Sequence, residues 1–135
     1  MQHTQPNVTA LDHLVLTVAD IPSTIEFYEN VLGMVSGKFQ TADDQVRWAL
    51  SFGYSKINLH QQGAEFEPKS ARPTAGSADL CFLTTVPIEN WIGHLGRMGI
   101  EIEEGPVART GAKAPLTSIY IRDPDQNLIE IAVER

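Results

Sequence analysis

The feature that most constrains this 135-residue chain is an internal repeat. A short apolar segment contains His13 and is followed 20 residues later by Gly33, while a similar segment contains Asp79 and is followed 20 residues later by Gly99. Both pairs of equivalent positions are therefore 66 residues apart, since 79 minus 13 and 99 minus 33 give the same number. A repeat of this kind indicates one supersecondary unit used twice, so we expect two similar modules.

The first copy predicts a strand, a helix and three further strands. Leu11–Val18 is short and rich in branched apolar residues, which favours a strand. A helix is predicted over Pro22–Leu32, where apolar residues recur at three- and four-residue spacing and a glycine follows the last turn. Turn-forming residues separate the next three predicted strands, which are Met34–Gln40, Val46–Ser51 and Lys56–Gln61.

The second copy repeats this order after a connecting segment. Glu65–Ser77 contains two prolines and a glycine and shows no apolar periodicity, so it predicts a loop. A strand is then expected over Ala78–Thr84, followed by a helix with one apolar face that ends at Gly99. The remaining predicted strands are Ile100–Glu104, Thr117–Arg122 and Leu128–Val133.

These segments predict an α+β fold in which tandem βαβββ modules form a curved mixed sheet. The modules span about residues 9–62 and 78–134, with a linker at about 63–77, and together they fill one domain over residues 1–135. A globular chain of this size buries roughly two-thirds of its extended surface, which is enough for one compact core.

Composition narrows the possible partners. With ten Lys plus Arg and seventeen Asp plus Glu, the formal net charge is −7, so nucleic-acid phosphates and anionic membrane surfaces would be repelled on average. The single cysteine excludes an internal disulfide and is typical of a reducing compartment. No apolar run approaches the roughly 20 residues that span a bilayer, and the polar start at Met1–Asn7 lacks the layout of a signal peptide. We expect a cytoplasmic protein without nucleic-acid or membrane partners.

Several candidate ligands occupy positions that the repeat makes comparable. His13 and Asp79 lie at the same place in the first strand of each module, and Glu130 lies among apolar neighbours in the last strand. Asn58 falls where Glu130 would lie in the first module, and His60 follows two residues later on the same face. The Glu130 carboxylate is either exposed on the solvent-facing side of an alternating strand or bound to a cation. A mixed imidazole and carboxylate set is what divalent Fe, Mn, Ni, Co or Zn accept.

Three other features carry alternative interpretations. Arg109–Lys113 is a flexible stretch with two cations, which either closes over a substrate carboxylate, phosphate or thiol-conjugate tail or forms a solvated loop. Cys81 is expected to be a small buried filler rather than a nucleophile, because no cationic sequence neighbour would lower its pKa. His94, on the second predicted helix, is expected at the surface or at an interface.

A family resemblance covers Leu11–Val133. The opening segment LDHLVLTVADIPSTIEFYENVLGM resembles the first strand and helix of the vicinal oxygen chelate superfamily, which includes glyoxalase I, fosfomycin-resistance proteins, bleomycin-binding proteins and extradiol dioxygenases. Two longer segments resemble its glyoxalase-domain-containing-protein-5 branch, namely INLHQQGAEFEPKSARPTAGSADLCF and EEGPVARTGAKAPLTSIYIRDPDQNLIEI. The resemblance implies βαβββ modules that form an open cup around a divalent metal, often with sites assembled across a homodimer.

The resemblance also implies roles for individual residues. His13 matches the first-strand metal histidine, and Glu130 matches the final-strand metal glutamate. Asp79 falls where these relatives usually have histidine, and Asn58 falls where glyoxalase I has another glutamate. Because a neutral carboxamide is a weak ligand, we expect the His60 imidazole to compete for the place of Asn58 in the metal site.

The resulting expectation is a metal-dependent lyase or isomerase of the glyoxalase I (lactoylglutathione lyase) type, with one Ni, Zn, Mn, Co or Fe ion per site. The ion would hold two oxygens of a small 2-oxoaldehyde or its thiol adduct, and Glu130 or Asp79 would act as general base. Tyr120 resembles the family tyrosine that reaches towards substrate, although an ordinary strand aromatic would look the same. The other expected substrate contacts are Asn58, Arg109 and Lys113. The alternatives are thiol or water addition to an epoxide, extradiol ring cleavage, and ligand sequestration without metal chemistry.

Overall fold

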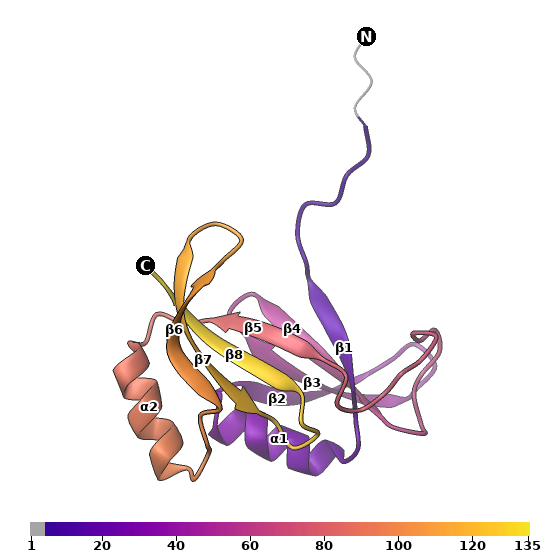
Figure 1. Cartoon of the computed structure of the whole chain (residues 1–135). Coiled ribbons are helices and arrows are strands. Elements are labelled where there is room, and N and C mark those ends of the chain that lie inside the picture. The colour runs from indigo at the N-terminus through magenta and orange to yellow at the C-terminus, as the bar shows by residue number, and fades with distance from the viewer. Residues whose placement is uncertain (1–4) are drawn as a thin grey trace.

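The computed structural model describes residues 5–135 and contains one arrangement twice (Figure 1). The first half forms β1 (His13–Val18), α1 (Ile21–Asn30), β2 (Val35–Gln40), β3 (Val46–Phe52) and β4 (Ser55–Gln61). The second half forms β5 (Asp79–Leu83), α2 (Ile88–Arg97), β6 (Glu104–Thr110), β7 (Pro115–Arg122) and β8 (Leu128–Glu134). The predicted α+β fold with two βαβββ modules is confirmed.

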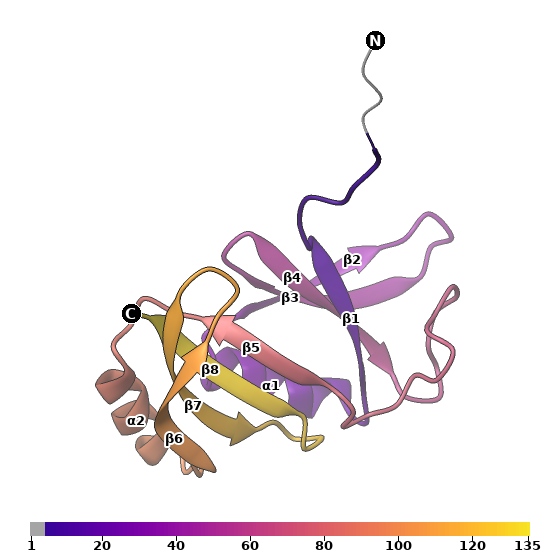
Figure 2. The same ribbon diagram turned by 45° about the horizontal axis from the view of Figure 1, so that its top comes forward.

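Each module forms its own four-stranded sheet. Sheet A has the strand order β1-β4-β3-β2, and sheet B has the equivalent order β5-β8-β7-β6. In both sheets the first strand pairs in parallel with the fourth, and the remaining pairs are antiparallel. This order leaves β1 and β5 at the edges of their sheets. Figure 2 shows the strands of the first half on one side of the molecule and those of the second half on the other.

Side-chain alternation assigns one face of each sheet to a common core. Buried apolar side chains from both sheets and both helices form one cluster, which includes Leu16, Val18, Tyr28, Leu50, Ile57, Leu59, Leu95, Ile119, Ile121, Ile129 and Ile131. Successive strand residues point to opposite faces, so the residues between these positions point away from the core. We call that second face of each sheet its outward face.

A buried polar network links the two modules. Tyr28 on α1 is fully buried, and its hydroxyl donates a hydrogen bond to Asp123 Oδ2 over 2.7 Å. Asp123, in the turn between β7 and β8, also accepts hydrogen bonds from the side chain and backbone N–H of Asn127. Burial, together with the neighbouring carboxylate, raises the pKa of Tyr28, so its hydroxyl stays protonated and continues to donate.

The predicted strand over Ile100–Glu104 is wrong. Only Glu104 belongs to a strand, because Ile100 and Ile102 pack against the core from the segment after α2 and do not pair with a neighbouring strand. The strand that does form, β6, runs through Thr110 and includes Arg109, which was expected in a flexible loop. The apolar alternation in Ile100–Glu104 therefore reflects a connecting segment that packs against the core. The strand that pairs with β7 is β6, which begins at Glu104.

His94 also differs from its expected place at the surface or at an interface. It is half-buried, and its Nε2 lies 2.9 Å from the carbonyl oxygen of Val31 at the end of α1. The contact joins the two helices within the chain.

The start of the chain is described only from residue 5, so the expectation drawn from Met1–Asn7 falls partly outside the described residues. Residues 5–12 extend out from the body of the molecule, and the chain runs along them towards the sheets and into β1 (Figure 1). Within residues 5–135, neither helix combines the length and the apolar character that crossing a membrane requires.

The network that links the modules predicts a stability difference between two tyrosines. Tyr28→Phe removes the donor to a buried carboxylate and should lower the free energy of unfolding by about 1–3 kcal/mol. Tyr54→Phe makes the same chemical change at a fully exposed side chain and should leave stability unchanged. Urea unfolding of the two variants and the native protein measures both effects. Equal stability of the two variants would contradict a stabilising role for the Tyr28 hydrogen bond.

Candidate functional site

The chemically reactive candidates lie on the two outward faces, at equivalent positions of the repeat. In sheet A, Val15 pairs with Asn58, and in sheet B, Cys81 pairs with Glu130. Val15 and Cys81 are 66 residues apart, so the pairing register makes Asn58 the counterpart of Glu130. His60 lies two residues beyond Asn58 on the same face.

On sheet B, Glu130 lies within a hydrogen-bonded group of side chains. Ser118 on β7 is fully buried, and its hydroxyl donates to Glu130 Oε2 over 2.6 Å. Tyr120 is the strand partner of Glu130, and its hydroxyl accepts a hydrogen bond of 2.9 Å from Arg109 Nε. The Arg109 guanidinium also forms an ion pair of 2.7 Å with Glu104. These contacts hold a carboxylate, a phenol and a guanidinium on one surface.

The environment of Cys81 disfavours its thiolate form. Its side chain lies beside Glu130 on the same face of sheet B. The residue is exposed, whereas the sequence predicted a buried position. Partial desolvation, with the Glu130 carboxylate as the next cause, raises the pKa of the Cys81 thiol to about 11. The thiol therefore stays protonated at neutral pH, and the expectation that Cys81 carries no nucleophilic role is consistent with its surroundings.

A cavity of about 530 Å³ adjoins Glu130. Its walls come from β5, β8 and the turn between β6 and β7, and they are formed by Cys81, Leu83, Thr110, Gly111, Ala112, Lys113, Leu116, Glu130 and Glu134. Most of this wall is apolar, and its charged groups are the carboxylates of Glu130 and Glu134 and the ammonium of Lys113. Such a cavity suits a small molecule with an apolar body and a few polar groups.

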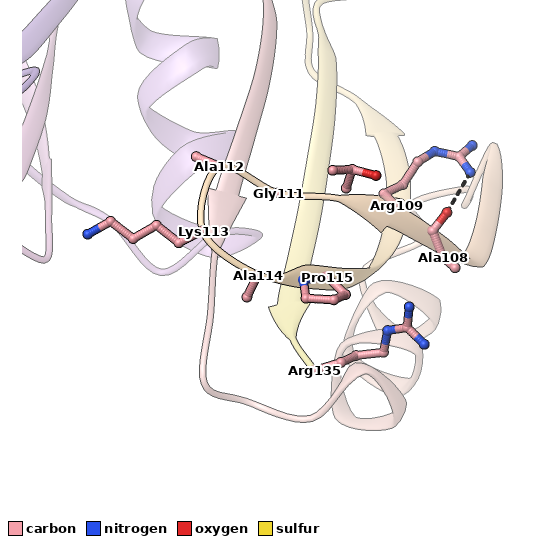
Figure 3. A pocket seen from close by; sticks show the side chains of 9 residues that line it. Ala108, Arg109, Gly111, Ala112, Lys113, Ala114, Pro115 and Arg135 are labelled. Carbon is pink, nitrogen blue, oxygen red and sulfur yellow. Dashed lines mark hydrogen bonds between the residues drawn. The ribbon is translucent and has the colours of Figure 1, made fainter.

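Arg109 and Lys113, expected to act as one stretch, are separated by the structure. Arg109 belongs to β6 and reaches Tyr120, whereas Lys113 lies in the turn and lines the cavity next to Glu130. Figure 3 shows the two side chains extending in different directions from the hairpin, beside a second hollow lined by Ala108–Pro115 and Arg135.

On sheet A, His13 is held by its sequence neighbour. Its side chain is 41% exposed, and its Nδ1 lies 2.8 Å from Asp12 Oδ2. This contact favours the tautomer whose lone pair is on Nε2, which is the arrangement common for metal-binding histidines. Lys56 is the strand partner of His13, but its ammonium lies over the Phe39 ring, 4.6 Å from the ring centroid.

His60 is enclosed rather than open to solvent. The residue is 3% exposed, and its ring makes an edge-to-face contact with Phe66 from the linker, with centroids 5.5 Å apart. The guanidinium of Arg47 covers the same Phe66 ring at 4.2 Å. Burial, and then the Arg47 charge, lowers the pKa of His60. Three polar atoms of this group are buried without a hydrogen-bond partner, namely His60 Nε2, Asn58 Oδ1 and Arg47 Nε.

The four expected metal ligands are distributed over both sheets. His13 and His60 belong to sheet A, whereas Asp79 and Glu130 belong to sheet B. Among residues 5–135 of one chain, no three His, Cys, Asp or Glu side chains lie close enough together to hold a metal ion. The predicted set is therefore not gathered within one copy of the chain.

Three residues near these groups were missed in the sequence. Ser118 looked like an ordinary alternating strand position, yet its hydroxyl fixes Glu130. Arg47 and Phe66 carried no motif, and only the path of the linker across sheet A brings Phe66 onto Arg47. The alternation of β7 could have placed Ser118 on the face of Tyr120, whereas no local signal predicts the position of Phe66.

Comparison with known proteins identifies the class. A family model, the Glyoxalase/Bleomycin resistance protein/Dioxygenase superfamily, matches residues 10–131. The chain therefore belongs to this superfamily, which is the one that its sequence resembles.

Individual relatives refine this picture. The chain is 58% identical to virulence protein STM3117 of Salmonella typhimurium over 125 residues, covering 93% of this chain and 84% of that protein. The crystal structure of STM3117 superposes with a TM-score of 0.88 at 55% identity and covers 96% of this chain and 100% of that one. Glyoxalase domain-containing protein RDO1 of Mycosarcoma maydis is 52% identical over 131 residues, covering 97% of this chain and 72% of that protein. These names do not single out the glyoxalase-domain-containing-protein-5 branch.

A more distant structure shares the fold alone. Lactoylglutathione lyase from Agrobacterium tumefaciens is 20% identical, with a TM-score of 0.68 and coverage of 94% of this chain and 95% of that one.

The environment of Cys81 predicts slow alkylation, and the chain has no other cysteine to obscure it. A pKa of about 11, against an ordinary value of 9.0, leaves about one hundredfold less thiolate at neutral pH. Glu130→Gln removes the adjacent negative charge, so it should lower the pKa and increase the iodoacetamide rate. Glu89→Gln, at an exposed position on α2, is the matched control and should not change it. An alkylation rate unaffected by Glu130→Gln would contradict the assigned contact.

Proposed function

We propose that this protein is a divalent-metal-dependent enzyme of the glyoxalase I type that acts on a 2-oxoaldehyde or its thiol adduct. The observation that carries the proposal is the placement of Glu130. Its carboxylate is half-buried beside a cavity of about 530 Å³, and among residues 5–135 it forms no salt bridge. A carboxylate that is partly removed from water without a paired cation is well suited to bind a metal ion.

The donor chemistry fits a divalent ion, and we propose that the site combines residues from two copies of the chain. His13 has its Nδ1 engaged by Asp12 and its Nε2 directed to act as a ligand, while Asp79 and Glu130 supply carboxylate oxygens. We propose these three residues as the metal ligands. His60, the fourth candidate, is enclosed beneath Phe66, so we assign it a different role below.

Assembly of such a site is supported by the edges of the sheets. β1 carries His13 and β5 carries Asp79, and both are edge strands with a free hydrogen-bonding side. Exposed apolar residues lie on the same outward faces, with Val15 at 47% and Leu83 at 61% exposure. In the proposed homodimer, sheet A of one protomer faces sheet B of its partner, so each site takes His13 from one chain and the carboxylates from the other.

The reaction that we propose is a proton transfer between adjacent carbons of the substrate. When bound, the metal supplies a positive charge that stabilises the oxygens of the substrate. In the thiol adduct of a 2-oxoaldehyde, Glu130 removes the proton from the hydroxyl-bearing carbon next to the carbonyl and returns it to the carbonyl carbon. The hydroxyl proton passes to the former carbonyl oxygen, so the product is an isomer of the adduct, a 2-hydroxy thioester. Ser118 orients the carboxylate through its hydrogen bond, and Asp79 is the alternative base.

The remaining residues of sheet B position the substrate. Tyr120 and Arg109 form a hydrogen-bonded pair whose phenol and guanidinium can donate to a substrate oxygen. Lys113 lines the same cavity and provides a charge for an acidic tail of the substrate. On sheet A, Asn58 provides a carboxamide at the position equivalent to Glu130.

A second candidate function is ligand sequestration without metal chemistry. The observation that favours it is the separation of the four expected ligands over two sheets within one copy of the chain. In that case, the largely apolar cavity beside Glu130 would hold the ligand. Metal content distinguishes the two functions, because a sequestering protein retains no stoichiometric ion.

The metal proposal predicts a defined loss on mutation. Protein purified without added metal should contain close to one divalent ion per subunit, measured by elemental analysis. His13→Ala and Glu130→Gln each remove a ligand and should abolish metal retention and activity, while the circular dichroism spectrum stays unchanged. Glu89→Gln should retain the metal, since its side chain is exposed on α2. Full metal occupancy in both ligand variants would refute the assignment.

Sharing of the site between protomers predicts complementation. After full subunit exchange between His13→Ala and Glu130→Gln chains, half of the dimers are mixed, and each mixed dimer has one intact site. Metal content and activity should then recover to about a quarter of the native value. Exchange demonstrated by mass labelling without any recovery would show that the site does not combine these residues from two chains.

A further inference from the structure

A second cavity lies on the outward face of sheet A, where the linker crosses the sheet. It has a volume of about 250 Å³. Its floor is formed by Val15 and Thr17 of β1 and His60 of β4, and its roof is formed by linker residues Pro68, Lys69, Ser70 and Pro73. The metal ligands proposed above, His13, Asp79 and Glu130, do not line this cavity, although Val15 also lies on the face of sheet A that we propose meets the partner subunit.

We propose that this cavity binds the carboxylate group of a short organic acid. The site is built from buried polar groups, because His60 is 3% exposed and Thr17 is 8% exposed. His60 Nε2 is also left without a hydrogen-bond partner in the folded chain. A buried polar group without a partner destabilises the fold, so a carboxylate that accepts a hydrogen bond from the Nε2–H tautomer of His60 is favoured.

The cavity is lined by one cationic side chain, with the carboxylates of Glu65 and Glu67 close to it. Lys69 is the cation of its lining, and the hydroxyls of Thr17 and Ser70 are additional donors. In the structure the Lys69 ammonium is ion-paired with Glu67, a side chain that is 72% exposed. Exposed ion pairs contribute little stability, so a carboxylate that enters the cavity can replace Glu67 as the partner of Lys69.

The walls favour an organic acid over an inorganic anion. Val15, Pro68 and Pro73 present apolar surface to the same space, which suits a short hydrocarbon chain attached to the carboxylate. The chain as a whole has a net charge of −7, so anions are attracted here only through these local groups. The proposed site lies within the first module and requires neither a metal ion nor a second copy.

The test uses propionate as the probe, titrated into the ¹⁵N-labelled native protein at constant ionic strength. We expect saturable shifts of the His60 imidazole and of the Thr17 and Ser70 backbone amides. Lys69→Gln should weaken the Kd for propionate about tenfold, because a charged hydrogen bond is lost. Glu67→Gln should tighten it, because the competing carboxylate is removed. Lys38→Gln, an exposed lysine on β2, is the matched control and should leave the Kd unchanged.

Three results would overturn the proposal. The first is an absence of saturable shifts at these residues in the native protein. The second is an unchanged Kd in both linker variants, whose exposed positions and unchanged amide spectra would exclude misfolding as the cause. The third is binding of inorganic phosphate as tight as that of propionate, which would show that the apolar walls make no contribution. Metal content plays no part in these measurements, so they succeed or fail independently of the proposed enzyme activity.

Discussion

Parallel pairing of β1 with β4, and of β5 with β8, determines which side chains face the core and which face outward. A shift of one residue in either register would exchange the two faces of a strand. In β8 such a shift would turn Ile129 and Ile131 outward and push Glu130 into the apolar cluster. The cost would be several kcal/mol, from lost apolar burial and from an unpaired carboxylate. The core thus fixes the positions of the candidate site residues without contacting their functional groups.

The same constraint explains which parts of the fold the sequence predicts. The 66-residue offset places His13 and Asp79 in equivalent positions, and β1 and β5 begin at these two residues. Such predictions succeed because burial imposes its period on every residue of a core strand. Ile100–Glu104 shows the limit of this signal. Its isoleucines are packed against the core like those of a strand, but a strand is defined by hydrogen bonds to a neighbour, and β7 pairs instead with Glu104–Thr110.

The candidate site was predictable as a set of positions and not as a set of contacts. Alternation places Glu130 on the outward face, but the hydrogen bond from Ser118 depends on the register of β7, which is not apparent from either segment alone. The enclosure of His60 depends on the course of a linker with two prolines and no periodicity, so local propensity could not predict that Phe66 would cover it. The distances between the candidate residues of sheet A and those of sheet B depend on packing across the whole molecule. No local sequence pattern could predict them.

The two modules have diverged in charge at their equivalent outward positions. Asn58 is neutral where Glu130 is negative, and this difference matters for the proposed metal site. A neutral His13 with two carboxylates carries a formal charge of −2, which a divalent ion cancels. A second glutamate at position 58 would add a further negative charge, which a single divalent ion would leave uncompensated. The carboxamide is therefore compatible with a neutral assembly, and it leaves the cationic groups of sheet A free to attract an acidic ligand.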